Sequence, residues 1–534
     1  MSMGEERKIP LVVGVTGHIN LRDKDRETLK AAVKRELSAL REQAPHTPLR
    51  MLCSLAAGVD LLCAEAAEEL GIPVTAPLPL AVAEYEKDFS PETLREFRAA
   101  AGRAESVFAV PAAETEPEGA DRDFWYRQAG IFVAEHCHVL LALWDGKENG
   151  LAAGSAATVR FALDGAWRPV RGMAVRTGEN TRVIHILTLR EGETGEGAGE
   201  VRYLGNETAW EEILTRTEEF NALAEETDCA GAPLIPGEKS KEATLLRTEA
   251  LYAAADGLSL RFAKEYRKAL AALALAGTLL AFSFLLYDNG EIIPMILVFG
   301  ILLLLAFFRY RKAARQDCHR RFIEYRVLAE TLRVQGCLRH AGSRLEAQRL
   351  MTWSQQQEEA WILCAVSGMN AAPPPEEKQE ILSCWVEDQK AYHERAGART
   401  ARQLEKNDRW LGIAMRISVV LYVAVLVYEL VCGGLIFRPA LAAEDAETGR
   451  KILLILLGTL SAGTLFLANY YGKMSLNRVT DDHGKMVRFY EKAEAQLKLR
   501  GQEENLLEAL AREELTENGN WSSYQRDNAP ELNL

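Results

Sequence analysis

The sequence predicts an α/β domain with a parallel sheet, followed by an α-helical membrane region with four transmembrane helices and cytosolic helical extensions. Between Lys8 and Glu191, short apolar runs of strand length alternate with helical stretches. That alternation is typical of a parallel sheet covered on both faces. Further along, two pairs of apolar segments each approach the hydrocarbon thickness of ~30 Å at about 1.5 Å per residue, so we expect two membrane hairpins.

Composition narrows the possible functions of the 534 residues. A length of this size suggests several domains, and the 48% hydrophobic content supports a full soluble core. The net charge of −13 argues against nucleic acid as a partner, because backbone binding needs clustered Lys and Arg. The nine cysteines form no CxxC pair, so we expect reduced thiols, no metal site and no cofactor. No apolar run near Met1 resembles a signal peptide, so the internal spans are expected to direct insertion.

Six strands are expected in the α/β domain. They are Ile9–Val15, Arg50–Cys53, Pro73–Ala76, Ser106–Val110, His138–Trp144 and Arg182–Thr188. Helical stretches lie between them at Asp23–Glu42, after Asp60, and at Pro91–Ala101, Arg122–Glu135 and Ala156–Asp164. In such sheets ligands bind beyond the carboxyl ends of the strands.

Three loops follow predicted strands and open onto helices, so we expect them to form one site. Amides at a helix start have no intrahelical acceptor and carry a partial positive charge, which favours phosphate. The ligand-binding candidates in these loops are Thr16, Gly17, His18, Ser54, Leu55, Ala56, Gly58, Asp60, Asp145, Gly146, Gly154, Ser155 and Ala156.

Further candidates flank these loops, each beside a structural alternative. Tyr85, Asp88 and Phe89 are expected to contact the base or ribose of a ligand, although such residues also pin loops. Tyr126 is a further ligand-binding candidate, and with Arg127 it begins a helix that faces the same edge. Arg127 would suit phosphate, or would lie on a solvated helix face. Asp60 and Glu65 would serve as acid or base in an N-glycosidase, or complement a helix dipole. No catalytic residue is assigned.

The loop residues resemble a known superfamily. Val13–His18, Ser54–Asp60, Leu141–Gly146 and Gly154–Arg160 together are similar to the SLOG superfamily, whose Rossmann-like members include the DNA-processing protein DprA and the LOG enzymes. The resemblance covers about residues 9–190 and implies a nucleotide or ADP-ribose-like ligand across these loops. LOG enzymes carry a catalytic Glu in a PGGxGTxxE loop. The matching stretch Ala153–Thr158 has no carboxylate, so phosphoribohydrolase activity is not expected.

A second resemblance concerns the membrane region. Tyr252–Asp256 and Tyr325–Gln335, on either side of the first hairpin, resemble the SLATT family of two-span effectors, which occur with SLOG domains and nucleotide synthetases in bacterial conflict systems. The resemblance implies membrane perturbation or pore formation when a nucleotide is sensed. The second pair of spans is interpreted as a diverged, tandem SLATT-like unit.

The expected spans are Ala269–Tyr287, Ile292–Phe308, Ile417–Phe437 and Ile452–Tyr471. Basic residues such as Lys268, Arg309, Arg416 and Lys473 flank their outer ends, so both termini are expected in the cytoplasm of a bacterial inner membrane protein. Glu429 is the single carboxylate in a span, and it either has a partner or water-filled path, or lies near the outer interface.

The expected domains are a SLOG-like domain (1–191), a linker and connecting helix (192–244), a first SLATT-like unit (245–372), a second (373–511), and a polar tail (512–534). The preferred interpretation is an antiviral membrane effector: a homo-oligomer that senses a nucleotide second messenger, ADP-ribose-derived or a cyclic oligonucleotide, and permeabilises the lipid bilayer. The synthetase partner would be a TIR-type or cyclic-nucleotide enzyme. The alternatives are a membrane-tethered nucleotide N-glycosidase, or a regulated transporter or scaffold.

Overall fold

The computed structural model describes residues 6–113, 116–117, 119–148, 150–165, 181–226, 234, 242–373, 375, 381–431, 443–498 and 503–528. The chain divides into two compact units. Unit 1 comprises Met1–Leu258, Glu324–Leu382 and Glu503–Asn520, and unit 2 comprises Ser259–Ile323, Ser383–Gln502 and Trp521–Leu534.

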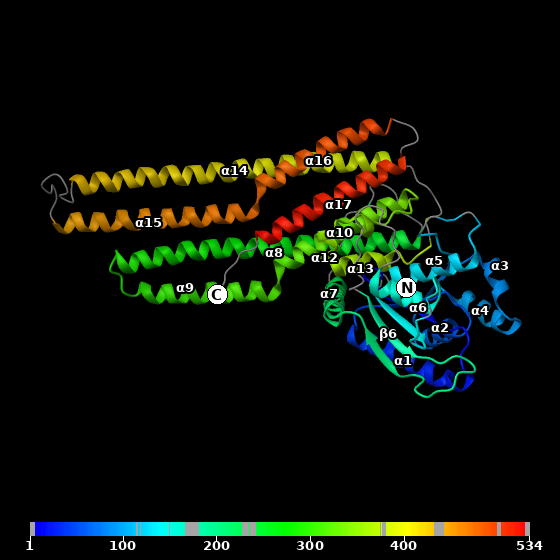
Figure 1. Ribbon diagram of the computed structural model, residues 1–534. Coiled ribbons are helices and arrows are strands. Elements are labelled where there is room, and N and C mark those ends of the chain that lie inside the picture. The colour runs from blue at the N-terminus through cyan, green and yellow to red at the C-terminus, as the bar shows by residue number, and fades with distance from the viewer. Residues whose placement is uncertain are drawn as a thin grey trace. The chain divides into compact units, whose positions relative to one another are not determined.

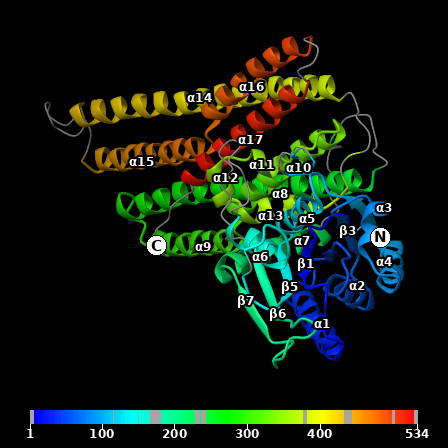
Figure 2. The same cartoon turned by 45° about the vertical axis from the view of Figure 1, so that its right-hand side comes forward.

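Unit 1 contains a seven-stranded sheet in the order β4-β3-β2-β1-β5-β6-β7. The strands are β1 (Leu11–Gly17), β2 (Leu49–Leu52), β3 (Val74–Leu78), β4 (Ser106–Ala109), β5 (Val139–Trp144), β6 (Arg182–Leu187) and β7 (Val201–Leu204). All neighbours pair in parallel except β6 and β7, which are antiparallel. The predicted Rossmann-like parallel sheet is therefore confirmed, and Figure 2 shows β1, β5, β6 and the edge strand β7.

Helices cover both faces of the sheet because successive strand residues point to opposite sides. The helices are α1 (Arg26–Gln43), α2 (Val59–Glu69), α3 (Val82–Tyr85), α4 (Pro91–Arg103), α5 (Arg122–His136), α6 (Ser155–Asp164) and α7 (Glu207–Glu226). Leu11, Val13 and Val15 pack with residues of α1, α2 and α4. Val12, from the other face of the same strand, packs with residues of α5 and α6.

The sheet extends past the expected boundary at Glu191. Gly192–Glu200, interpreted from its composition as a flexible surface loop or linker, joins β6 to β7 within one sheet. Arg22 fixes this loop, since its guanidinium donates to the carbonyls of Glu193 (3.2 Å) and Gly195 (3.1 Å). Helix α7 also belongs to this fold, because Trp210 is fully buried in the sheet's core.

Unit 1 also takes in the first part of α8 (Ala243–Asp288) and most of α10 (Cys318–His340) and α17 (Glu503–Asp527), together with α11 (Ala347–Leu350), α12 (Trp353–Glu358) and α13 (Ala360–Met369). Tyr325, from the SLATT-like run, is 1% exposed, and its ring centroid lies 5.3 Å from that of Phe220 in α7. Arg326 pairs with Asp256 (3.2 Å), and Arg333 pairs with Glu514 (3.1 Å). The run thus packs inside unit 1.

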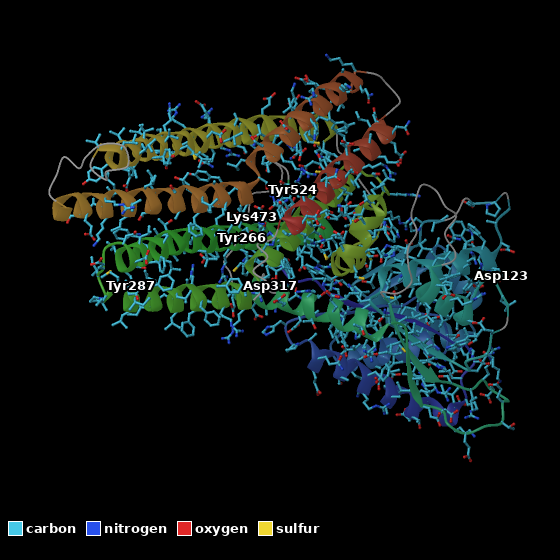
Figure 3. The ribbon with its side chains drawn as sticks, turned by 60° about the vertical axis from the view of Figure 1, so that its left-hand side comes forward. Asp123, Tyr266, Tyr287, Asp317, Lys473 and Tyr524 are labelled. Atoms are coloured by element: carbon cyan, nitrogen blue, oxygen red, sulfur yellow. The ribbon has the colours of Figure 1, made fainter. Side chains whose placement is uncertain are left out.

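Unit 2 contains the rest of α8, α9 (Met295–Gln316), α14 (Leu382–Val431), α15 (Ala443–Met474) and α16 (Leu476–Gln496). Figure 1 shows α8 beside α9 and α14 beside α15. In Figure 3, Tyr266 and Tyr287 mark the two ends of the apolar part of α8. Glu429 of α14 pairs with Arg450 of α15 at 2.6 Å, so the single carboxylate in a predicted span has a partner.

Three helical stretches of the described chain, not four, are long and apolar enough to cross a membrane: Ala243–Asp288, Leu382–Val431 and Glu447–Gln496. The expected span Ile292–Phe308 fails because helix α9 begins only at Met295, after Pro294. Its charge-free part therefore ends at Phe308 after ~21 Å, well short of the ~30 Å hydrocarbon core. In the span Ile417–Phe437, residues 432–437 lie outside the described part.

Close contacts at glycines hold α8 against α15. A Cβ on Gly277 would lie 2.6–2.8 Å from three ring atoms of Phe466. In the same way, the side chain of Leu285 in α8 packs against Gly458 of α15, and Thr278 of α8 packs against Gly463 of α15. Small residues that let helices approach closely are typical of membrane helix pairs.

Candidate ligand-binding site at the sheet edge

The sheet has a topological switch point between β1 and β5. From β1 the chain adds β2, β3 and β4 on one side and then returns to place β5 on the other. Ligands of open α/β sheets bind in the crevice outside the carboxyl ends of the strands at such a point. Because β1 ends at Gly17 and β5 ends at Trp144, the first and third predicted loops flank this crevice.

His18 and Asp145 connect these two loops directly. The backbone N–H of His18 donates to the carbonyl of Leu143 (3.1 Å), and the backbone N–H of Asp145 donates to Nε2 of His18 (3.0 Å). The Asp145 carboxylate, 3.6 Å from Nε2, would favour a protonated ring. Burial opposes this more strongly and, with the charge of Arg190, lowers the pKa of His18. We therefore assign a neutral imidazole whose Nε2 accepts the backbone hydrogen bond.

The second loop joins the first through the start of α2. The backbone N–H of Val59 donates to the carbonyl of His18 (3.1 Å). Gly58 has φ +80°, and a Cβ there would overlap the backbone carbonyls of His18 and Ile19. A side chain on Gly17 would likewise overlap Val59. Both glycines are thus required by close approach, and the predicted convergence of the Thr16–His18 and Ser54–Gly58 loops is observed.

Asp60 is buried and stabilises the Ser54–Gly58 loop through a hydrogen bond to its backbone. Its Oδ2 accepts from the backbone N–H of Ala56 (3.3 Å), and the thiol of Cys53 donates to its carbonyl (3.3 Å). The side chain is 6% exposed, and desolvation raises the pKa of Asp60 to about 7. Leu55, with φ +55°, turns its side chain fully into the core. The loop is therefore held in a strained backbone conformation by buried groups.

The third loop contributes an open helix start. Gly146 (φ +74°) and Gly154 (φ +96°) both adopt left-handed backbone conformations. Gly154 precedes Ser155, the first residue of α6, and nothing lies within 4 Å of the position a Cβ would take. Arg127 fixes this loop, because its Nη1 donates to the carbonyl of Ala152 (3.0 Å) while its guanidinium lies 5.0 Å from the Phe161 ring. Ala156 is buried in the core.

Two cations beside the crevice were missed in the sequence analysis. Arg190 Nε lies 3.8 Å from Oδ2 of Asp145, and Lys147 Nζ lies 3.0 Å from Glu193. The hydrogen bond from the backbone N–H of Arg190, and then that from Lys147, lower the pKa of Glu193. Arg190 lies three residues after the end of β6 and forms an isolated β-bridge with Leu21. Its position after a predicted strand was the signal that could have identified it, because ligands bind beyond the carboxyl ends of such strands.

The flanking tyrosines have different surroundings. Tyr126 donates its hydroxyl to Oδ2 of Asp88 (2.7 Å), and Arg122 pairs with the other oxygen (2.8 Å). Burial and the hydrogen bond to Asp88 raise the pKa of Tyr126. Tyr85 is 1% exposed and packs edge-to-face against Phe89 at 5.0 Å between ring centroids. Asp88 and Tyr126 thus form a surface cluster, whereas Tyr85 occupies the core.

Comparisons with known proteins leave the family open: no protein family matches this sequence, and no curated protein is similar to it. The resemblances to SLOG and SLATT therefore stay predictions. The chemistry assigned to the crevice rests on the geometry of the described residues.

The geometry separates the two carboxylates proposed for acid–base chemistry. Glu65 is 45% exposed and pairs with Lys30 (2.8 Å) and Arg26 (3.6 Å) of α1, which places it on a solvated helix face. Asp60 lies behind the Ser54–Gly58 loop with a pKa near neutrality. Of the two, Asp60 alone has the environment expected of a general acid.

Proposed function

We propose that this protein is a membrane effector whose sheet domain binds a nucleotide second messenger at the crevice between β1 and β5. The observation that carries the proposal is the convergence of three glycine-bearing loops at a switch point, in a chain whose described part also has three membrane-length helices. A sensor domain and membrane helices in one chain would allow a ligand bound inside the cell to change the state of the membrane directly.

Phosphate recognition is supported by the start of α6. The first N–H groups of the helix lack intrahelical acceptors, and no atom lies within 4 Å of a Cβ at Gly154. Arg190 and Lys147 would add positive charge. Asp145, whose side chain is 5% exposed, would accept hydrogen bonds from ribose hydroxyls, as acidic residues do in dinucleotide sites. An ADP-ribose-derived or cyclic oligonucleotide carries both groups.

The output we propose is membrane permeabilisation by a homo-oligomer in the bacterial inner membrane, with unit 1 on the cytoplasmic side. It is supported by the resemblance of the Tyr325–Gln335 run to SLATT effectors and by the basic residues around the apolar stretches. A TIR-type or cyclic-nucleotide synthetase would supply the messenger. Antiviral defence is the setting in which such a lethal response is useful.

A second candidate function is a nucleotide N-glycosidase, and the environment of Asp60 favours it. A carboxyl group with a pKa of about 7 can hold a proton at neutral pH and donate it to a leaving base. The two functions differ in turnover, because a sensor returns its ligand unchanged.

The experiment compares Gly154→Asp with Gly154→Ala in the full-length protein in detergent. Both variants carry the same backbone strain at φ +96°, and only the first places a carboxylate at the open helix start. With ADP-ribose and a cyclic dinucleotide as probes, we expect calorimetry to show one probe binding the wild type and Gly154→Ala, and binding to Gly154→Asp at least ~100-fold weaker from charge repulsion.

Equal binding to both variants would place the site elsewhere. Hydrolysis of a probe by the wild type, lost in Asp60→Asn, would support the N-glycosidase instead. Liposome leakage that follows probe binding is the result expected of the effector.

A further inference from the structure

A groove lies between α14 and α15, on the part of unit 2 where both helices carry basic residues. Its volume is ≈ 570 Å³, within the ~300–1,000 Å³ typical of small-molecule sites. The helices run antiparallel, since Glu429 pairs with Arg450 at the far end. The lining residues are Gln403, Lys406, Asn407, Trp410, Ile413, Ala414, Ile417, Leu460, Leu467, Tyr470, Tyr471 and Met474.

The lining changes in character along the groove. Ile413, Ile417 and Leu460 make one end apolar, whereas Lys406 and Asn407 make the other end polar. Trp410, Tyr470 and Tyr471 lie between these two ends. Tyr and Trp gather where a membrane changes from hydrocarbon to headgroups, so the groove has the same gradient as the bilayer around it. From Lys406 to Ile417 the helix rises ~16 Å, which is comparable to half a bilayer.

Asn407 has an unused donor at the polar end. It is 3% exposed, and its Oδ1 accepts from Nε2 of Gln403 at 2.8 Å. Its Nδ2 is buried and has no hydrogen-bond partner among the described residues. Buried amide groups are nearly always paired, so this donor indicates an acceptor that belongs to a ligand.

Lys406 supplies charge at the same end. It makes no ion pair with any described residue, and none of the residues lining the groove is acidic. Lys473, which Figure 3 labels at the end of α15, adds a second cation beside Met474 while donating to the carbonyl of Asn528 (3.0 Å). The polar end of the groove is therefore suited to an anion with acceptor oxygens.

We propose that this groove binds one anionic phospholipid from the leaflet at the basic ends of the helices. Its phosphate accepts from Nδ2 of Asn407 and pairs with Lys406, and one acyl chain lies along Ile413, Ile417 and Leu460. A free phosphate would leave the apolar part of the groove empty, so the occupant is a lipid. Trp410 and Ile417, 54% and 51% exposed, leave the groove open to the side for entry from the bilayer.

The lipid site goes beyond the proposed function, because it requires only that α14 and α15 lie in a membrane. Its test uses the full-length protein, stripped of lipid in detergent and titrated with phosphatidylglycerol or phosphatidylcholine under native mass spectrometry. The variants are Asn407→Leu, which removes the donor, and Lys406→Gln, which removes an exposed charge without disturbing the fold. The control is Arg416→Gln, an exposed cation outside the groove whose Nε donates to the carbonyl of Gly412.

We expect one phosphatidylglycerol per chain to bind the wild type and Arg416→Gln with the same affinity. Each groove variant should weaken it by about tenfold, the effect of losing one charge-assisted contact. Phosphatidylcholine should bind more weakly than phosphatidylglycerol, and inorganic phosphate should not compete. Equal binding by all four proteins, or equal binding of both lipids unaffected by Lys406→Gln, would show only non-specific lipid around the helices and overturn the proposal. Competition by inorganic phosphate at millimolar concentration would show an anion site instead of a lipid site.

Discussion

The crevice of unit 1 and the helix pairs of unit 2 are held together by different forces. At the sheet edge, buried polar groups fix the loops, as where His18 accepts from Asp145 (3.0 Å) and Asp60 accepts from Ala56 (3.3 Å). Between α8 and α15, the contacts are steric, with Phe466 lying against Gly277. The crevice is therefore sensitive to charge and pH, whereas helix pairing is sensitive to side-chain volume.

The difference arises from the solvent of each region. In water, apolar burial drives the sheet domain together, which leaves buried hydrogen bonds to fix the conformation of its loops. In a bilayer, lipid tails are as apolar as leucine, so helices associate through close packing and small residues. A conformational signal from the crevice would have to reach the close steric contacts between the helices of unit 2. It would travel through helices that belong to both units. Helix α8 is one, since it continues unbroken from Leu258 to Ser259 across the division.

The largest expected effect comes from interrupting α8. We propose that this helix transmits the effect of ligand binding, and that several chains act together because one ligand rarely supplies the ~5.5 kcal/mol needed to move a two-state equilibrium from about 1:99 to 99:1. Ala254, Ala255 and Leu258 are buried in unit 1, so an insertion there would damage packing. A Gly-Ser segment between the exposed residues Leu260 and Arg261 leaves those contacts in place.

With that insertion, ligand affinity should stay close to the wild-type value while ligand-triggered leakage from liposomes disappears. An insertion of Ala residues of equal length, which keeps the helix, serves as the control and should retain part of the leakage. Full leakage with the Gly-Ser insertion would show that α8 does not carry the signal.

The next effect concerns the pH dependence contributed by Asp60. Its pKa is raised from 3.8 to about 7 in the folded chain. The stability associated with the neutral carboxyl is fully present below pH 3.8 and is lost as pH rises through 7, because the unfolded chain ionises freely and the folded chain does not. Asp60→Asn keeps the acceptor for Ala56 and removes the ionisation. Its stability relative to wild type should therefore rise by about 3 kcal/mol between pH 5 and pH 8.

Urea unfolding of both proteins in detergent, followed by circular dichroism at several pH values, measures this difference. His18 has a lowered pKa and contributes the opposite pH dependence, but it is present in both proteins and cancels. A constant difference between the two proteins from pH 5 to pH 8 would mean that Asp60 titrates normally in the folded state. Glu65→Gln, at a solvated ion pair, is the matched control and should show little dependence.

The elements of the sheet could be predicted from the sequence because each central strand is a continuous buried apolar run. β7 could not, since Val201–Leu204 is short, lies at the edge, and has Tyr203 51% exposed. The span at Ile292–Phe308 was overestimated because hydropathy does not reveal that the helix starts only after Pro294.

The candidate site also has features that could be predicted from the sequence and features that could not. Loop positions could be predicted because they are set by the ends of strands. Side-chain direction could not, because it depends on packing: Leu55, Tyr85 and Ala156 were chosen for their place in or near a loop, and all three are buried. Arg190 was missed because it approaches Asp145 from the loop between β6 and β7, whose path follows from the pairing of those strands. Lys147 was missed because its position depends on Glu193 in the same loop.

The smallest expected effect tests the steric contact in unit 2. Alanine in place of glycine favours a helix by about 1 kcal/mol, but a Cβ at Gly277 would lie 2.6–2.8 Å from the Phe466 ring, and overpacking costs about 1–3 kcal/mol. Gly277→Ala should therefore be destabilised by on the order of 1 kcal/mol, seen as a lower thermal midpoint in detergent. Gly412→Ala, with nothing within 4 Å of its Cβ, should be unchanged or more stable.

Phe466→Leu tests the same contact from the side of α15. This substitution should destabilise the Gly277→Ala protein less than it destabilises the wild type, because it relieves the overlap. Additive effects of the two substitutions would show that the α8–α15 contact does not govern helix pairing.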